Sequence, residues 1–362
     1  MQAVAREVTH RYVDPLTQVW LTAARRIGLG VVRTPDAYAA TDGRGTLAIG
    51  DDAVLDADDS LAQMIFHELC HSLVEGEAAF AQPDWGMDNT GPDHDWREHA
   101  CLRTQWVLAG RHGLRGVFAP TTDFRAFWNQ LAGDVLADRH DASVIAAIRA
   151  LDRATQKPWA PALDEALAAS AEIAAVAARF APGPGEAAEV PALWRDVTAP
   201  PARHPSGLPA GEAAATCGDC AWRAGARCQQ AIATEGVRPY VKIDPAWPAC
   251  ERFEAALDCQ TCGACCREAY HSVEVGRRDP VRKKQPQLVV DRGSYLEVQR
   301  AGDRCAALAG GTFEPVADPA GAAPRLTRYH CTIYDDRPRT CRDFTLGSAH
   351  CLTARRRVGL SL

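Results

Sequence analysis

The sequence predicts an α+β protein with a mainly helical N-terminal part, which includes a small sheet, and a loop-rich, cysteine-rich C-terminal part. Three observations support this prediction. Apolar residues recur at helical spacing over much of the first 180 residues. Proline and glycine are concentrated between residues 181 and 211, which is typical of a linker. Twelve of the 14 cysteines lie after residue 216.

The first elements are a helix and two short strands. Asp14 and Pro15 form a helix start, apolar spacing continues over residues 16–27, and Gly28 ends the pattern. Residues 31–32 and 46–49 are predicted strands, with glycines in the turn between them.

The next predicted helix carries a His-Glu-x-x-His pattern. Residues 58–60 offer an N-cap and Gly76 offers a stop. Positions i and i+4 share one helix face, so His67 and His71 can present two imidazole nitrogens to one zinc ion. Glu68 lies about 100° round the helix, where it would hold a water molecule as a general base. This pattern predicts metal-assisted hydrolysis.

A third zinc ligand is expected on a second helix around residues 93–102. Glu98 falls on the inward stripe of that helix, and an inward carboxylate needs a partner because an unpaired buried charge is costly. His94, Asp95 and His99 are the alternatives. Cys70 and Cys101 are expected to pack as small buried residues, with ligation by them as second choice.

The order helix, short strands and His-Glu-x-x-His helix resembles the zincin metallopeptidases. With Glu98 as third ligand the site is gluzincin-like, and the resemblance implies peptide-bond hydrolysis on Zn²⁺. The longer metzincin continuation is absent, because positions 74–77 read Val-Glu-Gly-Glu. Further helices are predicted at 124–136, 142–151 and 163–180.

The first cysteine group after the linker contains four thiols. Four thiolates suit a closed tetrahedral zinc site or an iron–sulfur cluster. A secreted disulfide framework would need an export signal, which the N-terminal residues lack, so metal ligation is the better interpretation. The members are Cys217, Cys220, Cys228 and Cys250.

The second cysteine group contains eight thiols in three motifs. These are a Cys-x-x-Cys-Gly-x-Cys-Cys run, a Cys-x-x-Leu and a Cys-x-Ile-Tyr-x-x-Arg-Pro-x-x-Cys-Arg-x-Phe block, all between residues 259 and 344, with one more cysteine beyond. Together the motifs resemble the CxxCxxCC (YkgJ-like) family of zinc- or iron-chelating proteins. The members are Cys259, Cys262, Cys265, Cys266, Cys305, Cys331, Cys341 and Cys351.

That resemblance implies bound zinc, bound iron or an iron–sulfur cluster. The sequence does not decide among these three. Eight thiols exceed one four-ligand site, and the sequence does not assign them. The adjacent thiols of Cys265 and Cys266 cannot easily face one ion; they serve different centres, or one stays unligated. Arg337 either shapes the loop before Cys341 or neutralises an anionic site.

The sequence therefore predicts four segments: a zincin-like domain (1–180), a linker (181–211), a four-cysteine module (212–256) and a CxxCxxCC domain (257–362). The expected function is zinc-dependent hydrolysis of a peptide or protein substrate, fused to a metal-binding or iron–sulfur part. The alternative is a metal-binding or cluster module with a degenerate hydrolase domain.

The net charge and the hydropathy of the chain limit which classes of partner are expected. A net charge of −6 argues against nucleic acid as a partner. With no apolar run of 18 residues and no secretory signal, a protein of the cytoplasm without a membrane partner is expected. The oligomeric state is not indicated.

Overall fold

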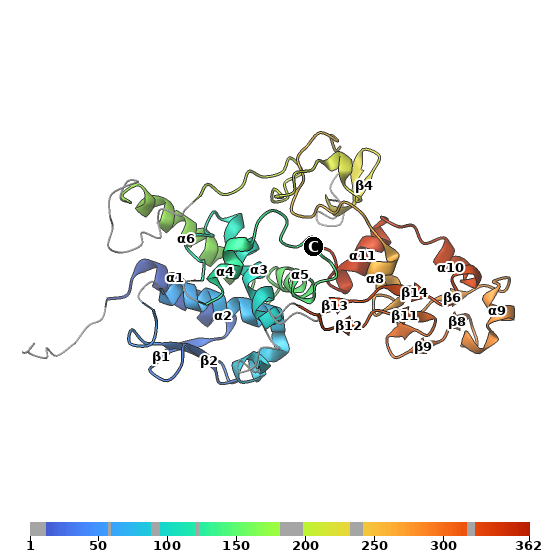
Figure 1. Cartoon of the computed structure of the whole chain (residues 1–362), viewed down its shortest axis with the longest axis horizontal. Coiled ribbons are helices and arrows are strands. Elements are labelled where there is room, and N and C mark those ends of the chain that lie inside the picture. The colour runs from blue at the N-terminus through green and yellow to red at the C-terminus, as the bar shows by residue number, and fades with distance from the viewer. Residues whose placement is uncertain are drawn as a thin grey trace, which may run out of the picture. The chain divides into compact units, whose positions relative to one another are not determined.

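The computed structural model describes residues 12–56, 59–87, 95–120, 123–181, 198–231, 242–316 and 323–362. Helices and small sheets are mixed along the chain, which is compatible with the predicted α+β class (Figure 1). The chain divides into two compact units. The first comprises the described residues of Met1–Met87, Gln105–Ala126 and Arg153–Pro200, and the second those of Asp88–Thr104, Phe127–Asp152 and Pro201–Leu362.

Helix α1 (Pro15–Ile27) matches the predicted first helix. The Asp14 carboxylate accepts a hydrogen bond from the Thr17 N–H at 2.9 Å and so caps the first turn. Gly28 ends the helix with φ at 114°, which a residue with a Cβ rarely adopts. Trp20, on the inner face of α1, is fully buried and packs against Phe66 and Phe118.

Three strands form a small sheet in the order β1–β3–β2, beside α1 and α2 in Figure 1. Strand β1 (Gly30–Thr34) runs parallel to β3 (Thr46–Gly50), and both were predicted. Strand β2 (Ala39–Thr41) pairs antiparallel with β3 and was not predicted. Its three residues are too few to show an alternating pattern in the sequence.

Helix α2 (Leu61–Glu75) is the predicted helix of the His-Glu-x-x-His pattern. Ser60 caps it by accepting a hydrogen bond from the Gln63 N–H, and Gly76 ends it; Asp58 lies outside the described residues. Two 3-10 turns follow, η1 (Glu77–Ala81) and η2 (Asp84–Gly86).

Four helices complete the N-terminal half of the chain. Helix α3 (Asp95–Arg111) is one continuous helix. Helices α5 (Ala142–Arg153) and α6 (Ala162–Ala178) match their predictions. The predicted helix at 124–136 is wrong in length: α4 (Arg125–Gln130) stops early, and Gly133 adopts a left-handed φ of 62° that a helix cannot contain.

The elements of residues 201–362 are short. Their strands pair into small sheets, the largest being β6–β8–β7. The elements are η5 (Cys217–Asp219), β4 (Arg223–Ala224), β5 (Arg227–Cys228), α8 (Cys259–Cys262), η6 (Ala264–Cys266), β6 (Glu274–Val275), α9 (Val281–Lys284), η7 (Pro286–Leu288), β7 (Val289–Asp291), β8 (Leu296–Val298), β9 (Arg300–Ala301), β10 (Arg304–Cys305), β11 (Leu308–Gly310), β12 (Phe313–Glu314), β13 (Arg325–Leu326), β14 (Tyr329–Cys331), η8 (Tyr334–Asp336), α10 (Arg339–Arg342) and α11 (Ala349–Arg357).

The second unit is discontinuous in sequence. Ile145 of α5 packs in one apolar cluster with Cys262, Tyr329 and Leu360. Most of the predicted linker, residues 182–197, lies outside the described residues. The last segment of the second unit begins at Pro201, inside that predicted linker. Among the helices described, none is both long enough and apolar enough to cross a membrane.

Candidate metal centre

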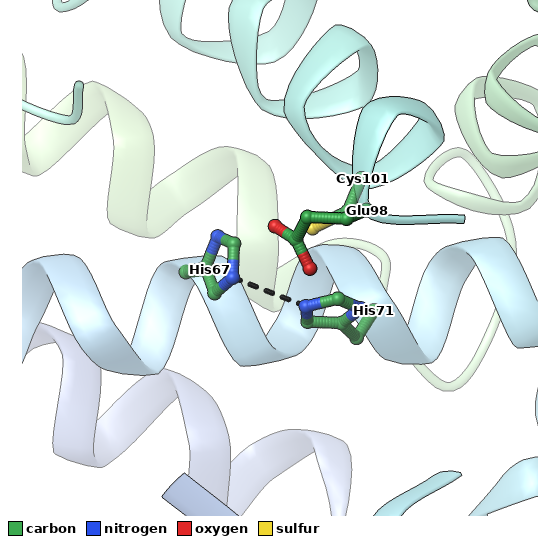
Figure 2. A group of neighbouring side chains, drawn as sticks. All are labelled: His67, His71, Glu98 and Cys101. Carbon is green, nitrogen blue, oxygen red and sulfur yellow. Dashed lines mark hydrogen bonds between the residues drawn. The ribbon is translucent and has the colours of Figure 1, made fainter. Parts of the chain in front are cut away.

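Helices α2 and α3 bring four potential metal donors together (Figure 2). His67 and His71 lie one turn apart on α2, and Glu98 and Cys101 lie one turn apart on α3. One ligand atom from each of the four lies within 4.8 Å of every other. Three of them are the zinc ligands predicted from the sequence, and Cys101 joins them as a fourth donor.

The spacing of the two imidazoles suits a single metal ion. The Nε2 atoms of His67 and His71 lie 3.1 Å apart. Two imidazole nitrogens on one tetrahedral zinc, each about 2.0–2.1 Å from the ion, are about 3.3 Å apart. Two histidines, a carboxylate and a thiol are also donors that zinc accepts, so the residues present fit a zinc ion.

A chain of hydrogen bonds orients His67. The Gln105 amide nitrogen donates to the carbonyl oxygen of Phe118, which turns the amide oxygen towards His67. That oxygen lies 2.9 Å from His67 Nδ1. Because an amide oxygen only accepts, Nδ1 carries the hydrogen, and the lone pair of a neutral ring is then on Nε2, which faces His71.

Glu68 is held by a tryptophan from η2. The Trp85 indole N–H donates to Glu68 Oε2 at 2.8 Å, and both side chains are buried. Asp84 and Trp85 have φ values of 47° and 57°, uncommon for residues with a side chain. Asp84 accepts a hydrogen bond from the Thr41 N–H at 3.0 Å, so strand β2 holds this turn in place.

Of the three alternative third ligands, one lies outside the described residues and two are not among the four donors. His94 lies outside the described residues. Asp95 and His99 are not among the four donors. The His99 ring stacks on Phe127 with centroids 3.9 Å apart, and burial lowers the pKa of its imidazole, with the Arg103 charge adding to that effect.

The first cysteine group surrounds a small cavity. Its four thiols and His204 line a space of about 10 Å³, which is about the size of one water molecule or one ion. Burial, followed by the neighbouring thiols, raises the pKa of Cys217 to about 11. Burial likewise raises the pKa of Cys250 to about 12, and the backbone N–H of Arg252 opposes part of that rise.

His204 contacts this group through a defined tautomer. The Ser206 N–H donates to His204 Nδ1 at 3.0 Å, so Nδ1 is the acceptor and Nε2 carries the hydrogen. Nε2 lies 3.3 Å from Cys217 Sγ. The histidine can therefore donate to a thiolate at Cys217, and it is 4% exposed.

The second cysteine group surrounds a much larger cavity, of about 710 Å³. Seven of its eight thiols line this space, and Cys305 lies buried nearby in a cluster with Ile333 and Ala307. Within the described residues, the only group of three or more donors that meets the 4.8 Å spacing is the one around His67. The thiols of both cysteine groups are spaced more widely.

Comparison of the sequence and structure with family models, curated proteins and solved structures gives no match.

Four residues of these sites were missed or ranked second in the sequence. Cys101 and Gln105 lie three and seven residues after Glu98, so helical spacing could have placed both on its face. Trp85 follows a loop without periodicity, and His204 lies in the predicted linker. Nothing in the local sequence of either one indicates its contact.

Proposed function

We propose that this chain is a zinc-dependent hydrolase of peptide bonds, fused to a cysteine-rich metal-binding part. The observation that carries the proposal is the convergence of His67, His71 and Glu98 within 4.8 Å of one another. Glu68, which follows His67 in α2, is the residue that would act as base. This is the donor set of two histidines and a carboxylate, which leaves a position for water when zinc is bound.

Each residue of the site would have a separate role in the reaction. His67, His71 and Glu98 would hold the zinc ion, which supplies a water with a pKa lowered to about 7. Glu68 would accept the proton of the attacking water and return it to the leaving amine nitrogen. Trp85 holds one oxygen of that carboxylate at 2.8 Å, which leaves the other oxygen for the proton. Gln105 orients His67.

A second candidate function follows from Cys101. Structural zinc sites are closed by four protein ligands, whereas catalytic sites keep one position open. With Cys101 as fourth ligand, the His67 group would be a closed centre, and the chain would be a metal-binding protein without hydrolytic activity. The observation that favours this alternative is that the Cys101 thiol lies within 4.8 Å of the ligand atoms of the other three donors.

The experiment uses the full chain loaded with zinc and a peptide library analysed by mass spectrometry. Glu68→Gln is expected to retain one zinc at the His67 group and to lower kcat by about 10²–10⁴-fold, the usual loss on removing a general base. Hydrolysis that survives Glu68→Gln contradicts the mechanism, and a zinc-loaded wild type without hydrolysis contradicts the proposal.

Cys101→Ala separates the two candidates, with Cys70→Ala as a matched control. Both cysteines are buried, but Cys70 is not among the four donors. In the open centre, Cys101→Ala retains zinc and activity, as Cys70→Ala does. In the closed centre, Cys101→Ala weakens zinc binding by orders of magnitude while Cys70→Ala leaves it unchanged.

A further inference from the structure

The run Cys259–Cys266 bends sharply at one glycine. The turn of helix α8 is capped by Asp258, whose carboxylate accepts from the Gln260 N–H at 2.8 Å. Gly263 then adopts φ 59°, and a Cβ there would lie 2.8 Å from the Tyr329 ring. The chain continues as η6, a 3-10 turn in which successive residues are about 120° apart. Cys265 and Cys266 therefore point in different directions.

The two adjacent cysteines pack in different apolar clusters. Cys265 packs against the cluster that contains Cys262 and residues of α11, such as Ala354. Cys266 packs against the cluster that contains Cys305, and Cys331 and Cys341 contact that same cluster. The backbone thus divides the double cysteine between two neighbourhoods.

The thiols that act electrostatically on each of the two cysteines follow the same division in large part. Burial raises the pKa of Cys266 to about 12, and the thiols that add to this effect are first Cys305, Cys341 and Cys331 and last Cys259. Burial also raises the pKa of Cys265, and there the neighbours are Cys262, then Cys266 itself, then Cys351 and Cys259.

Local structure holds each set together. Helix α11 packs against η6 and brings Cys351, whose N–H is bonded to the capping Ser348 at 3.2 Å. In the other set, β11 pairs with β14, and the Thr332 N–H donates to the Ala307 carbonyl at 2.8 Å, which joins the chain near Cys305 to the chain near Cys331. Asp279 accepts from the Arg339 N–H at 3.0 Å and positions α10, which carries Cys341.

Each set also has its own arginine. Arg355 is 4% exposed. Burial by itself would lower the pKa of its guanidinium, but Glu254 and the thiols of Cys262 and Cys351 outweigh burial and raise that pKa. Burial raises the pKa of Cys341 to about 12, the thiols of Cys305 and Cys331 add to that rise, and the Arg337 guanidinium opposes it. Two separate anionic centres would each have a cation beside them.

The size of the cavity at the second cysteine group favours clusters over single ions. Thiolates on one tetrahedral zinc, each about 2.3 Å from the ion, lie about 3.8 Å apart. No trio of thiols in the described residues meets even a 4.8 Å spacing. A cavity of about 710 Å³ is also far larger than one ion needs, in contrast to the cavity of about 10 Å³ at the first cysteine group.

We propose that residues 257–362 hold two iron–sulfur clusters, each bound by four cysteines and divided at the Cys265–Cys266 bond. The first cluster is bound by Cys259, Cys262, Cys265 and Cys351. The second is bound by Cys266, Cys305, Cys331 and Cys341. Each thiol loses its proton on binding, and the four-cysteine ligand set is the usual one for both common cluster types.

The test counts iron and acid-labile sulfide in the anaerobically purified full chain. Cys259→Ala and Cys331→Ala are the main single variants, because Cys259 is exposed and Cys331 is half-buried, so their removal disturbs packing least. Each is expected to lose one cluster's iron and sulfide and to retain the other cluster, which reports that the unit is folded. Cys70→Ala should lose neither.

Double variants test the division itself. Cys259→Ala with Cys265→Ala is expected to lose no more iron than Cys259→Ala alone, because both cysteines serve one cluster. Cys259→Ala with Cys266→Ala is expected to lose both clusters. The proposal is overturned if Cys265→Ala with Cys266→Ala loses no more iron than either single change, or if the purified chain carries zinc without iron and sulfide in this region.

Discussion

The two groups of metal donors differ in what holds them in position. Around His67, two long helices, α2 and α3, set four donors within 4.8 Å of one another. In residues 257–362 the donors lie on turns and strands of two to four residues, apart from α11, around a cavity of about 710 Å³. A helix can position donors through its own hydrogen bonds and packing, whereas short elements with small cores commonly need bound metal to fold.

Removing metal tests this difference and is expected to have the largest effect. A structural metal site contributes roughly 10 kcal/mol or more to folding in small metal-binding domains. The metal-stripped chain is therefore expected to be cleaved by protease much faster within residues 201–362 than within residues 12–87. Fragment masses over time provide the measurement, and equal cleavage of both regions would contradict the comparison.

The pH dependence of metal uptake should also separate the two groups. Burial raises the pKa of Cys250, Cys266 and Cys341 to about 12 each, and that of Cys217 to about 11. These thiols keep their protons at neutral pH, so a metal must displace them and binding strengthens as pH rises towards 11–12.

Between pH 7 and pH 8 the apparent affinity of a four-thiol centre should rise up to about 10⁴-fold, or tenfold for each displaced proton. The His67 group contains only one thiol, so fewer protons have to be displaced and its metal affinity should change far less over this pH range. Competition with a chelator at each pH measures the metal affinity of both groups of donors. If the metal affinities of the two groups changed equally with pH, the expected difference between them would be wrong.

Two ion pairs offer a smaller contrast in stability. Arg355 and Glu254 form a pair 2.5 Å apart with side chains only 4% and 7% exposed, and Glu254 also accepts from the Trp222 indole at 2.9 Å. Removing one partner of such a buried pair costs about 3–5 kcal/mol. Glu254→Gln is therefore expected to lower the free energy of unfolding by about that amount.

The matched control is Glu165→Gln, which breaks an exposed ion pair. The side chains of its two members, Arg26 and Glu165, are 45% and 56% exposed. Such surface pairs contribute about 0–1 kcal/mol. Urea unfolding of both variants in the metal-loaded chain measures the difference. If the two substitutions cost the same, the buried pair does not stabilise the second unit as proposed.

Orientation of His67 by Gln105 is expected to have the smallest effect. Loss of a hydrogen-bonding partner to a metal-bound histidine usually weakens metal affinity by about 10–100-fold. Gln105→Ala should therefore weaken zinc binding by that factor. Gln63→Ala is the control, because Gln63 is also a buried glutamine and its amide nitrogen donates to a carbonyl of the same loop, at Ala119. Equal affinities in both variants would remove Gln105 from the site.

Helical spacing alone was enough to predict much of the first site. The apolar pattern of α2, its cap at Ser60 and the i, i+4 histidines are local features, and helical spacing on α3 is enough to predict an inward-facing Glu98. Their placement near one another is a geometric finding, while their roles as ligands stay predictions. The cysteine motifs were equally visible, but the thiols could not be assigned to centres.

The tertiary structure decided which donors meet. Gln105 reaches His67 across 38 residues, and Trp85 reaches Glu68 from a turn held by strand β2. The separation of Cys265 from Cys266 depends on which apolar clusters pack on either side of η6. Periodicity specifies the face of an element that a residue occupies, because it reflects local backbone geometry. It cannot specify which distant segment covers that face, because that is decided by packing of the whole chain.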